Sequence, residues 1–185
     1  MRPVCVLLIE ITPLSAIRLL AVVEQKEYPP CLVFERGDET LQEWMTKECR
    51  EIETCRFALS SVSSRRSRTL RQLPLLLQMM KALASIHDQD IVHRDLQPHN
   101  IVLFWSEQTW KIANFEQAEL NGERCPLDYT LPYAPPEIVK AKEEGRTSIT
   151  AKPSFDLWTF GIISFALLAG SHSPFHAFPK NMKAI

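Results

Sequence analysis

Short apolar runs at the start of the chain alternate with polar turns. The runs 16–25 and 30–35 contain several β-branched residues, and a polar segment that ends in two prolines separates them. Runs of this length and composition are typical of strands, and a polar connection between two of them favours a hairpin. The pattern therefore predicts a two-stranded hairpin before residue 36.

A helical pattern follows and then dissolves. Residues 40–49 begin with a threonine and place Leu41, Trp44 and Met45 at helical spacing, which predicts a short amphipathic helix. From 50 to 71, serines and arginines occur without a clear period. We expect an exposed loop insertion there, either simply solvated or offering its basic cluster to an acidic partner or a regulatory kinase.

The next helical signal is strongly apolar and extends to about residue 87. Pro74 fits only the first turn of a helix, because proline has no backbone N–H to donate. The apolar residues around it recur at spacings of three and four. The face that they predict consists of Leu73, Leu76, Leu77, Met80, Leu83, Ala84 and His87.

Two strands and a long polar segment are predicted after this helix. Residues 100–104 and 110–113 are short apolar runs around a polar turn at 106–109, which indicates a second pair of strands. The stretch from 114 to 137 is polar and rich in proline. We expect it to be a long connection without a clear element of its own.

The last predicted element is an apolar helix over 154–169. Ser154 or Asp156 is expected to cap its first turn, and Gly170 to end it. Its longest apolar run is too short to span a bilayer. We therefore expect a buried helix and no association with a membrane.

Composition narrows the classes of partner and compartment. The 185 residues carry a formal net charge of −1 and 45% hydrophobic side chains, which is an ordinary globular profile. This balance gives no electrostatic reason to expect a nucleic-acid partner. The five cysteines lack C-x-x-C spacing, so we expect free thiols in a reducing, cytoplasmic compartment rather than disulfides or a zinc site.

Four motifs occur in order along the second half of the chain. They are IVHRDLQPHNIVLF at 91–104, KIANFE at 111–116, TLPYAPPE at 130–137 and DLWTFGIISFALLAGSHSPF at 156–175. Together they resemble the catalytic loop, the D-F-G segment, the end of the activation segment and the large C-lobe helix of eukaryotic protein kinases. The resemblance covers roughly residues 16–178.

The resemblance implies an α+β, protein-kinase-like fold, mainly the helical C-lobe with the last N-lobe strands and hinge. Residues 1–178 would form a partial kinase-like domain. Its parts would be an N-lobe remnant with the hinge over 1–36 and a C-lobe over 38–178, and a tail would follow over 179–185. No G-x-G-x-x-G loop and no V-A-I-K lysine occur, and the sequence stops soon after SPF at 173–175 without the last C-lobe helices of the family. By this resemblance the chain would be a kinase domain truncated at both ends.

The resemblance also implies the chemistry of phosphoryl transfer, which depends on positioning and on neutralising charge. Asp95 would orient the substrate hydroxyl or accept its proton. Asn100 would hold one Mg²⁺ through its side-chain oxygen. A turn that these two side chains cap is the alternative, because Asp and Asn both favour turns.

Three positions depart from the family pattern. Asn114 replaces the metal-binding aspartate of D-F-G and offers Mg²⁺ a neutral oxygen. Gln97 replaces a lysine that donates to the transferring phosphate, so a positive charge is missing. Glu116 replaces a glycine, whose backbone freedom is lost, although its carboxylate could serve as a displaced metal ligand. These departures predict a severe loss of turnover.

A nucleotide site at the hinge is a further implication of the resemblance. Backbone groups there would dock the adenine of ATP, and the residues concerned are Phe34, Glu35, Arg36 and Gly37. Val102 would pack beneath the adenine, although an ordinary strand core accounts for it equally well. ATP and Mg²⁺ are therefore the cofactors expected of an active form.

Other residues would support this site by the same resemblance. His93 and Phe115 would belong to a hydrophobic column under the D-F-G segment, and Arg94 would face a charge in the activation segment. The supports nearer the substrate would be Thr130, Tyr133, Glu137 and Asp156. Asp156 would accept hydrogen bonds from the catalytic loop, and Glu137 would need an arginine partner. A plain proline-rich turn is the alternative for Thr130 and Tyr133.

We therefore expect a protein-kinase-like domain with impaired or absent catalysis that acts by binding or scaffolding a protein. A divergent Ser/Thr kinase that uses Asn100 and Glu116 for metal, and acts on protein substrates, is one alternative. A small-molecule phosphotransferase shares the H-x-D loop, but TLPYAPPE and DLWTFG are typical of kinases with protein substrates. A truncated, non-functional fragment is the remaining interpretation.

Overall fold

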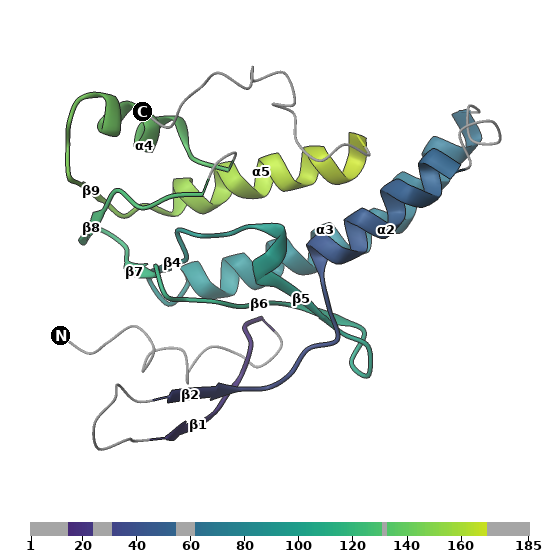
Figure 1. The fold of residues 1–185 in the computed structure, drawn as a ribbon, viewed down its shortest axis with the longest axis horizontal. Helices are drawn as coiled ribbons and strands as arrows, with labels where there is room; N and C mark the ends of the chain where they lie inside the picture. The colour runs from purple at the N-terminus through teal and green to yellow at the C-terminus, as the bar shows by residue number, and fades with distance from the viewer. Residues whose placement is uncertain (1–14, 24–30, 55–61, 131–132, 170–185) are drawn as a thin grey trace.

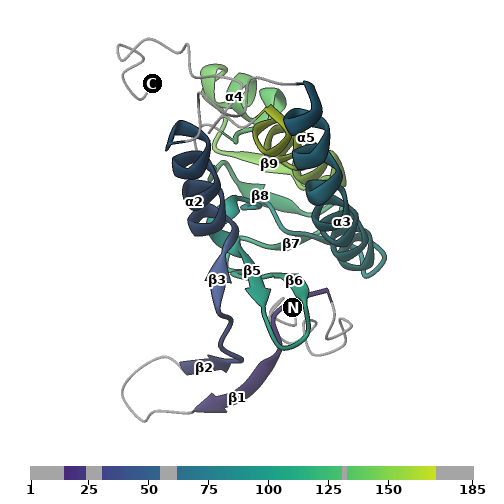
Figure 2. The ribbon, with the colours of Figure 1, turned by 90° about the vertical axis from the view of Figure 1, so that its right-hand side faces the viewer.

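The computed structural model of the chain describes residues 15–23, 31–54, 62–130 and 133–169. Helices gather in one part of the molecule, and a two-stranded hairpin extends away from them (Figures 1 and 2). Helices and strands thus contribute together, and the predicted α+β class is confirmed. No helix in the described part is both long and apolar enough to cross a membrane.

The predicted hairpin is present. Strand β1 (Leu19–Val23) pairs with β2 (Cys31–Phe34) in antiparallel register, with Val23 opposite Cys31. Most of its side chains are exposed. The connection between the two strands lies outside the described residues.

The predicted helix after the hinge is longer than expected. Strand β3 (Glu39–Thr40) leads directly into α2 (Leu41–Thr54). The Glu43 carboxylate accepts from the Thr40 N–H at 2.8 Å, and the Thr40 hydroxyl accepts from the Glu43 N–H at 3.2 Å. This reciprocal pair is a capping box, which explains why the helix begins here.

The prediction of an exposed loop over 50–71 is wrong for those residues of the range that the structure describes. Helix α2 continues to Thr54, and α3 (Val62–His87) begins well before residue 71. Pro74 lies inside α3 and not in its first turn. It is exposed, as is Leu70, so water can reach the Leu70 carbonyl that loses its N–H partner.

The face of α3 that packs into the core differs from the predicted face. Leu76 and Leu83 are buried as expected, and the other buried apolar residues are Leu75, Met79, Ala82 and Ile86. The predicted residues that are exposed instead are Leu73, Leu77, Met80 and Ala84. Two apolar stripes share the same period on this helix, and periodicity cannot tell which of them meets the rest of the chain.

A small antiparallel sheet supports the catalytic-loop motif. Its order is β3-β5-β6, with β5 (Ile101–Phe104) paired to β6 (Thr109–Ile112). The short 3₁₀ helix η1 (Pro98–Asn100) enters β5 directly. The two strands predicted here are confirmed within one or two residues.

The stretch 114–137 contains more structure than its polar composition predicts. Two short strands pair with strands elsewhere: β7 (Glu119–Leu120) with β4 (Ile91–Val92), and β8 (Arg124–Pro126) with β9 (Ser148–Thr150). Helix α4 (Pro136–Glu143) begins at its end. Strands of two or three residues carry too little periodicity to be detected from sequence.

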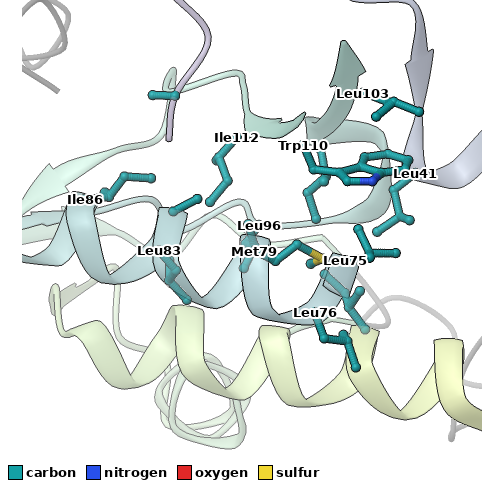
Figure 3. Packing of buried hydrophobic residues seen from close by; sticks show 14 of the residues in the cluster. Leu41, Leu75, Leu76, Met79, Leu83, Ile86, Leu96, Leu103, Trp110 and Ile112 are labelled. Atoms are coloured by element: carbon teal, nitrogen blue, oxygen red, sulfur yellow. The ribbon is translucent and has the colours of Figure 1, made fainter. Parts of the chain in front are cut away.

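Helix α3 lies at the centre of the hydrophobic core, between the β5–β6 strands and helix α5 (Pro153–Ala169) (Figure 3). Trp110 and Ile112 pack on it from the sheet, and Ile163 and Leu167 belong to the same cluster from α5. The predicted N-terminal caps of α5, Ser154 and Asp156, are wrong, because the helix already begins at Pro153. Gly170, which was predicted to end the helix, lies outside the described residues. Asp156 instead turns its carboxylate toward the catalytic-loop motif.

Candidate active site

The Asp95 carboxylate is surrounded by neutral hydrogen-bond donors. Gln97 Nε2 donates to both of its oxygens, at 3.1 and 3.0 Å. Asn100 Nδ2 donates to Oδ2 at 3.0 Å, and the Thr130 hydroxyl donates to Oδ1 at 2.8 Å. Only 8% of Asp95 is exposed. These bonds satisfy the ionised carboxylate without any cationic side chain.

Asn100 is held by the turn that precedes β5. Its backbone N–H donates to the Gln97 carbonyl at 2.8 Å, and its side-chain Nδ2 donates to the Asp95 carbonyl at 2.7 Å. A carbonyl only accepts, so Nδ2 must face Asp95 and Oδ1 must face away. On that other side, Asn114 Nδ2 donates to Asn100 Oδ1 at 3.4 Å.

Asn114 lies two residues after the end of strand β6 and adopts a left-handed backbone conformation, with φ of 61°. Asparagine tolerates this region better than most residues. The Ala113 N–H donates to the Asn100 carbonyl at 2.8 Å. The structure therefore brings Asn114 and Thr130 to the catalytic-loop residues Asp95, Gln97 and Asn100.

Glu116 lies apart from this cluster. Its side chain is exposed and makes no hydrogen bond or ion pair with any described residue. Its φ is not positive, unlike that of Asn114. The backbone at this position is therefore unstrained, and the expectation that the segment switches conformation less freely without a glycine stays a prediction.

The side chains at this site do not fit Mg²⁺. Mg²⁺ favours carboxylate oxygens, whereas Asn100 and Asn114 are amides, and Asn114 presents its nitrogen to Asn100. Among the described residues, no three His, Cys, Asp or Glu side chains are grouped so that they could hold a metal ion.

Asp156 anchors the catalytic-loop motif to α5. It is buried and accepts the backbone N–H groups of His93 and Arg94, both at 2.8 Å. The His87 ring nitrogen Nε2 lies 2.8 Å from the same carboxylate. One side chain therefore ties the end of α3, the loop and α5 together.

His93 connects the loop to the segment after β6. Its ring packs edge-on against Phe115, with 4.7 Å between the ring centroids, and Nε2 lies 2.9 Å from the Ala113 carbonyl. Burial lowers the pKa of His93 below its ordinary value of 6.5, although nearby Asp156 and the Ala113 bond oppose this. The ring is therefore neutral near pH 7, with its proton on Nε2 because a carbonyl can only accept.

The sequence predicted that Arg94 faces a charge in the activation segment, but Arg94 forms no ion pair with a described residue. Its guanidinium donates to the carbonyls of Gln117, at 2.8 Å, and Pro126. It thereby connects the loop to two points of the 114–137 stretch. Backbone carbonyls cannot be recognised as partners from residue identity, which explains the error.

The hinge contains an ion pair that the sequence analysis missed. Lys111 on β6 is 2% exposed and contacts Glu35 Oε1 at 2.9 Å and Glu107 Oε2 at 3.1 Å. Its Nζ lies 4.3 Å from the centroid of the Phe104 ring. Burial acts to raise the pKa of Glu35, but the bonds from Lys111 and the Arg18 N–H outweigh it and lower that pKa. The sequence feature that could have indicated this ion pair is a lysine inside an otherwise apolar strand.

The remaining hinge residues lie close to the β5 strand. A Cβ atom added at Gly37 would lie 2.1 Å from Val102 Cγ1, so only glycine fits where the hinge crosses Val102. Phe34 is half-buried and Arg36 is exposed. The Val102 side chain thus borders the hinge backbone, and its expected place beneath an adenine stays a prediction.

Tyr133 and Glu137 lie on the side toward α5. Tyr133 is half-buried against the core, and burial raises its pKa. Its carbonyl accepts from the Thr159 hydroxyl at 3.1 Å. Glu137 accepts from the Ser154 hydroxyl at 3.2 Å and forms no ion pair with a described arginine.

Comparison with known proteins agrees with these motifs. A sequence profile described as "Protein kinase domain" matches residues 15–184. The "Serine/threonine-protein kinase chk-1" of Caenorhabditis elegans is 37% identical over 99 residues, which are 50% of this chain and 18% of that protein. The "Aurora kinase" of Yarrowia lipolytica is 33% identical over 98 residues, or 52% of this chain and 24% of that protein. The match thus spans only about a fifth of each relative's length.

A solved structure supports the fold. The "Structure of the Cydia pomonella Granulovirus kinase, PK-1" covers 88% of this chain and 52% of that chain, with a TM-score of 0.61. At 18% sequence identity this likeness concerns the fold alone. With the profile match and the four ordered motifs, it establishes that the chain belongs to the protein kinase domain family and has a kinase-like α+β fold.

Proposed function

We propose that this chain is a protein-kinase-like domain whose catalysis is impaired or absent, and that it acts by binding a protein partner. Protein kinase domains generally use ATP and Mg²⁺. The observation that supports impairment is the set of neutral amides around Asp95. Gln97 and Asn114 stand where the family pattern has a lysine and an aspartate, and both side chains take part in hydrogen bonds within the site.

A protein is the partner class that the family suggests, because its members act on proteins. We further propose a reducing intracellular compartment. Cys125 is a buried free thiol. Disulfides are the rule in oxidising compartments and rare in reducing ones.

A phosphate-transfer assay tests the proposal. The wild-type chain and Asp95→Ala would be incubated with radiolabelled ATP, Mg²⁺ and a generic protein substrate. We expect both to incorporate phosphate at the same background rate. Transfer by the wild type that Asp95→Ala abolishes would refute the proposal.

A divergent Ser/Thr kinase is the second candidate, and the retained geometry of Asp95 and Asn100 favours it. Both side chains are buried and fixed by hydrogen bonds. In this form Glu116 would have to supply the missing carboxylate. Glu116→Ala should then abolish any activity, and an active protein that tolerates this change would exclude this candidate.

A further inference from the structure

The side chains of four site residues form one continuous hydrogen-bonded chain. Gln97 donates to Asp95, Asn100 also donates to Asp95, and Asn114 donates to Asn100. We propose that this chain of amides takes the place of a divalent cation. It holds the catalytic loop to the segment after β6, and the site does not bind Mg²⁺ or Mn²⁺. This inference deepens the proposed impairment of catalysis and rests on it.

The direction of each bond follows from the groups involved. The Asp95 carbonyl and carboxylate can only accept, so they orient the amides of Asn100 and Gln97 with nitrogen inward. The side of the Asn100 amide that faces away from Asp95 therefore presents only Oδ1, which is a hydrogen-bond acceptor. Asn114 meets it with a donor. An aspartate at 114 could not do so when ionised, because a carboxylate has no N–H.

The amide pair also continues the β5–β6 sheet. The last residues paired in that ladder are Ile101 and Ile112. One step further, the Ala113 N–H donates to the Asn100 carbonyl at 2.8 Å, and the Asn100–Asn114 side-chain bond lies beyond it. The loop and the following segment are therefore joined by backbone and side-chain bonds, a connection that needs no ion.

A cation would find few free ligands here. Asn100 Oδ1 already accepts the Asn114 N–H, and both oxygens of Asp95 accept from neutral donors. The nearest additional carboxylate along this segment, Glu116, is exposed and takes no part. Mg²⁺ would therefore compete with these donors for a ligand set that lacks the second carboxylate it favours.

The test is a thermal melt of the full chain in EDTA and in millimolar MgCl₂ or MnCl₂, without nucleotide. We expect the wild-type Tm to be the same in all three. Asn114→Asp should melt about 2–4 °C lower in EDTA, because it loses one hydrogen bond and places a second carboxylate near Asp95. Mg²⁺ should raise its Tm, since a ligand that binds only the folded state stabilises it.

Asn121→Asp is the matched control. Asn121 is exposed in the turn after β7, away from the site, and the same chemical change there should neither lower the Tm comparably nor create a response to Mg²⁺. The inference is overturned if the wild-type Tm rises with Mg²⁺, or if Asn114→Asp behaves as Asn121→Asp does.

Calorimetric titration of the wild type with MnCl₂ gives a second result that needs no variant. We expect no binding heat beyond dilution, and saturable binding would refute the inference. The two proposals fail separately. Saturable Mn²⁺ binding without phosphate transfer would refute only the amide substitution, whereas Asp95-dependent transfer by a chain without Mn²⁺ binding would refute only the impaired catalysis.

Discussion

Two single residues determine the charge of the candidate site. Gln97 brings no positive charge and Asn114 brings no negative charge, and both side chains are neutral donors instead. At an effective dielectric constant near 20, a unit charge about 4 Å away contributes roughly 4 kcal/mol. Each ~1.4 kcal/mol lost in a transition state slows a reaction tenfold. On the proposed impairment of catalysis, we therefore expect either replacement alone to slow turnover by orders of magnitude.

The Asp95 carboxylate should be important for stability as well as for geometry. In Asp95→Asn, an amide N–H would replace one oxygen and face donors such as Gln97 and Thr130. We expect the free energy of unfolding to fall by about 1–3 kcal/mol, measured by urea denaturation. Asp128→Asn, at an exposed position, is the control. An equal effect of both changes would contradict this account.

His93 should make stability depend on pH. Its side chain is fully buried and its folded-state pKa lies below 6.5. Below pH 6.5 the unfolded chain therefore binds a proton that the folded chain does not, and stability falls as the pH decreases. We expect a slope of up to about 1.4 kcal/mol per pH unit from this residue.

Urea titrations between pH 7.5 and pH 5.5 would measure this dependence. His93→Gln keeps a donor for the Ala113 carbonyl but does not titrate, so its slope should be smaller than that of the wild type. Unchanged slopes would show that another group is responsible.

At the scale of whole elements, two similar apolar stripes of α3 should contribute differently to the free energy of unfolding. Leu83 is 2% exposed and belongs to the core cluster, whereas Leu77 is 50% exposed. We expect Leu83→Ala to cost about 2–5 kcal/mol of unfolding free energy. Leu77→Ala should change it by no more than about 0.5 kcal/mol.

The two variants form a matched pair, because they make the same change on one helix. Urea denaturation of both reports which stripe is packed. Comparable losses would mean that Leu77 is packed in solution as closely as Leu83, which would contradict its observed exposure.

The exposed apolar stripe of α3 and the hairpin β1–β2 both present apolar side chains to solvent. Leu70, Leu73, Leu77 and Met80 are all about half exposed, as are several side chains of β1 and β2. Apolar groups gathered in this way are typical of contact surfaces. Nothing in the described part of the chain covers them.

At the scale of the whole molecule, Asp156 connects three distant segments. The end of α3, the catalytic loop and α5 all contact its carboxylate. Asp156→Asn would leave one buried backbone N–H, of His93 or Arg94, facing an amide N–H. We expect a loss of about 1–3 kcal/mol and faster hydrogen exchange at that amide.

Hydrogen exchange followed by NMR or mass spectrometry would locate this loss. Asp88→Asn, at an exposed position near the end of α3, is the control. Protection of both loop amides in Asp156→Asn at the wild-type level would show that the loop is held by other contacts.

Much of the architecture follows from the sequence alone. The hairpin, the helix after the hinge, the pair β5–β6 and the apolar helix α5 all appear where local patterns predicted them, because each has a period that its own residues define. The order of the four motifs also identified the family before any coordinates. The replacements at 97, 114 and 116 could be read directly for the same reason, since they are matters of residue identity.

Only the tertiary structure decided which groups meet. It selected the stripe of α3 that faces the core, extended that helix through the arginine-rich segment and past Pro74, and joined Lys111 to Glu35. It also turned Asn114 toward Asn100 and left Glu116 exposed without strain. Burial, donor direction and long-range pairing arise from contacts between distant segments. A local sequence pattern therefore indicates which donors and apolar faces exist, but the packed fold determines which groups they contact.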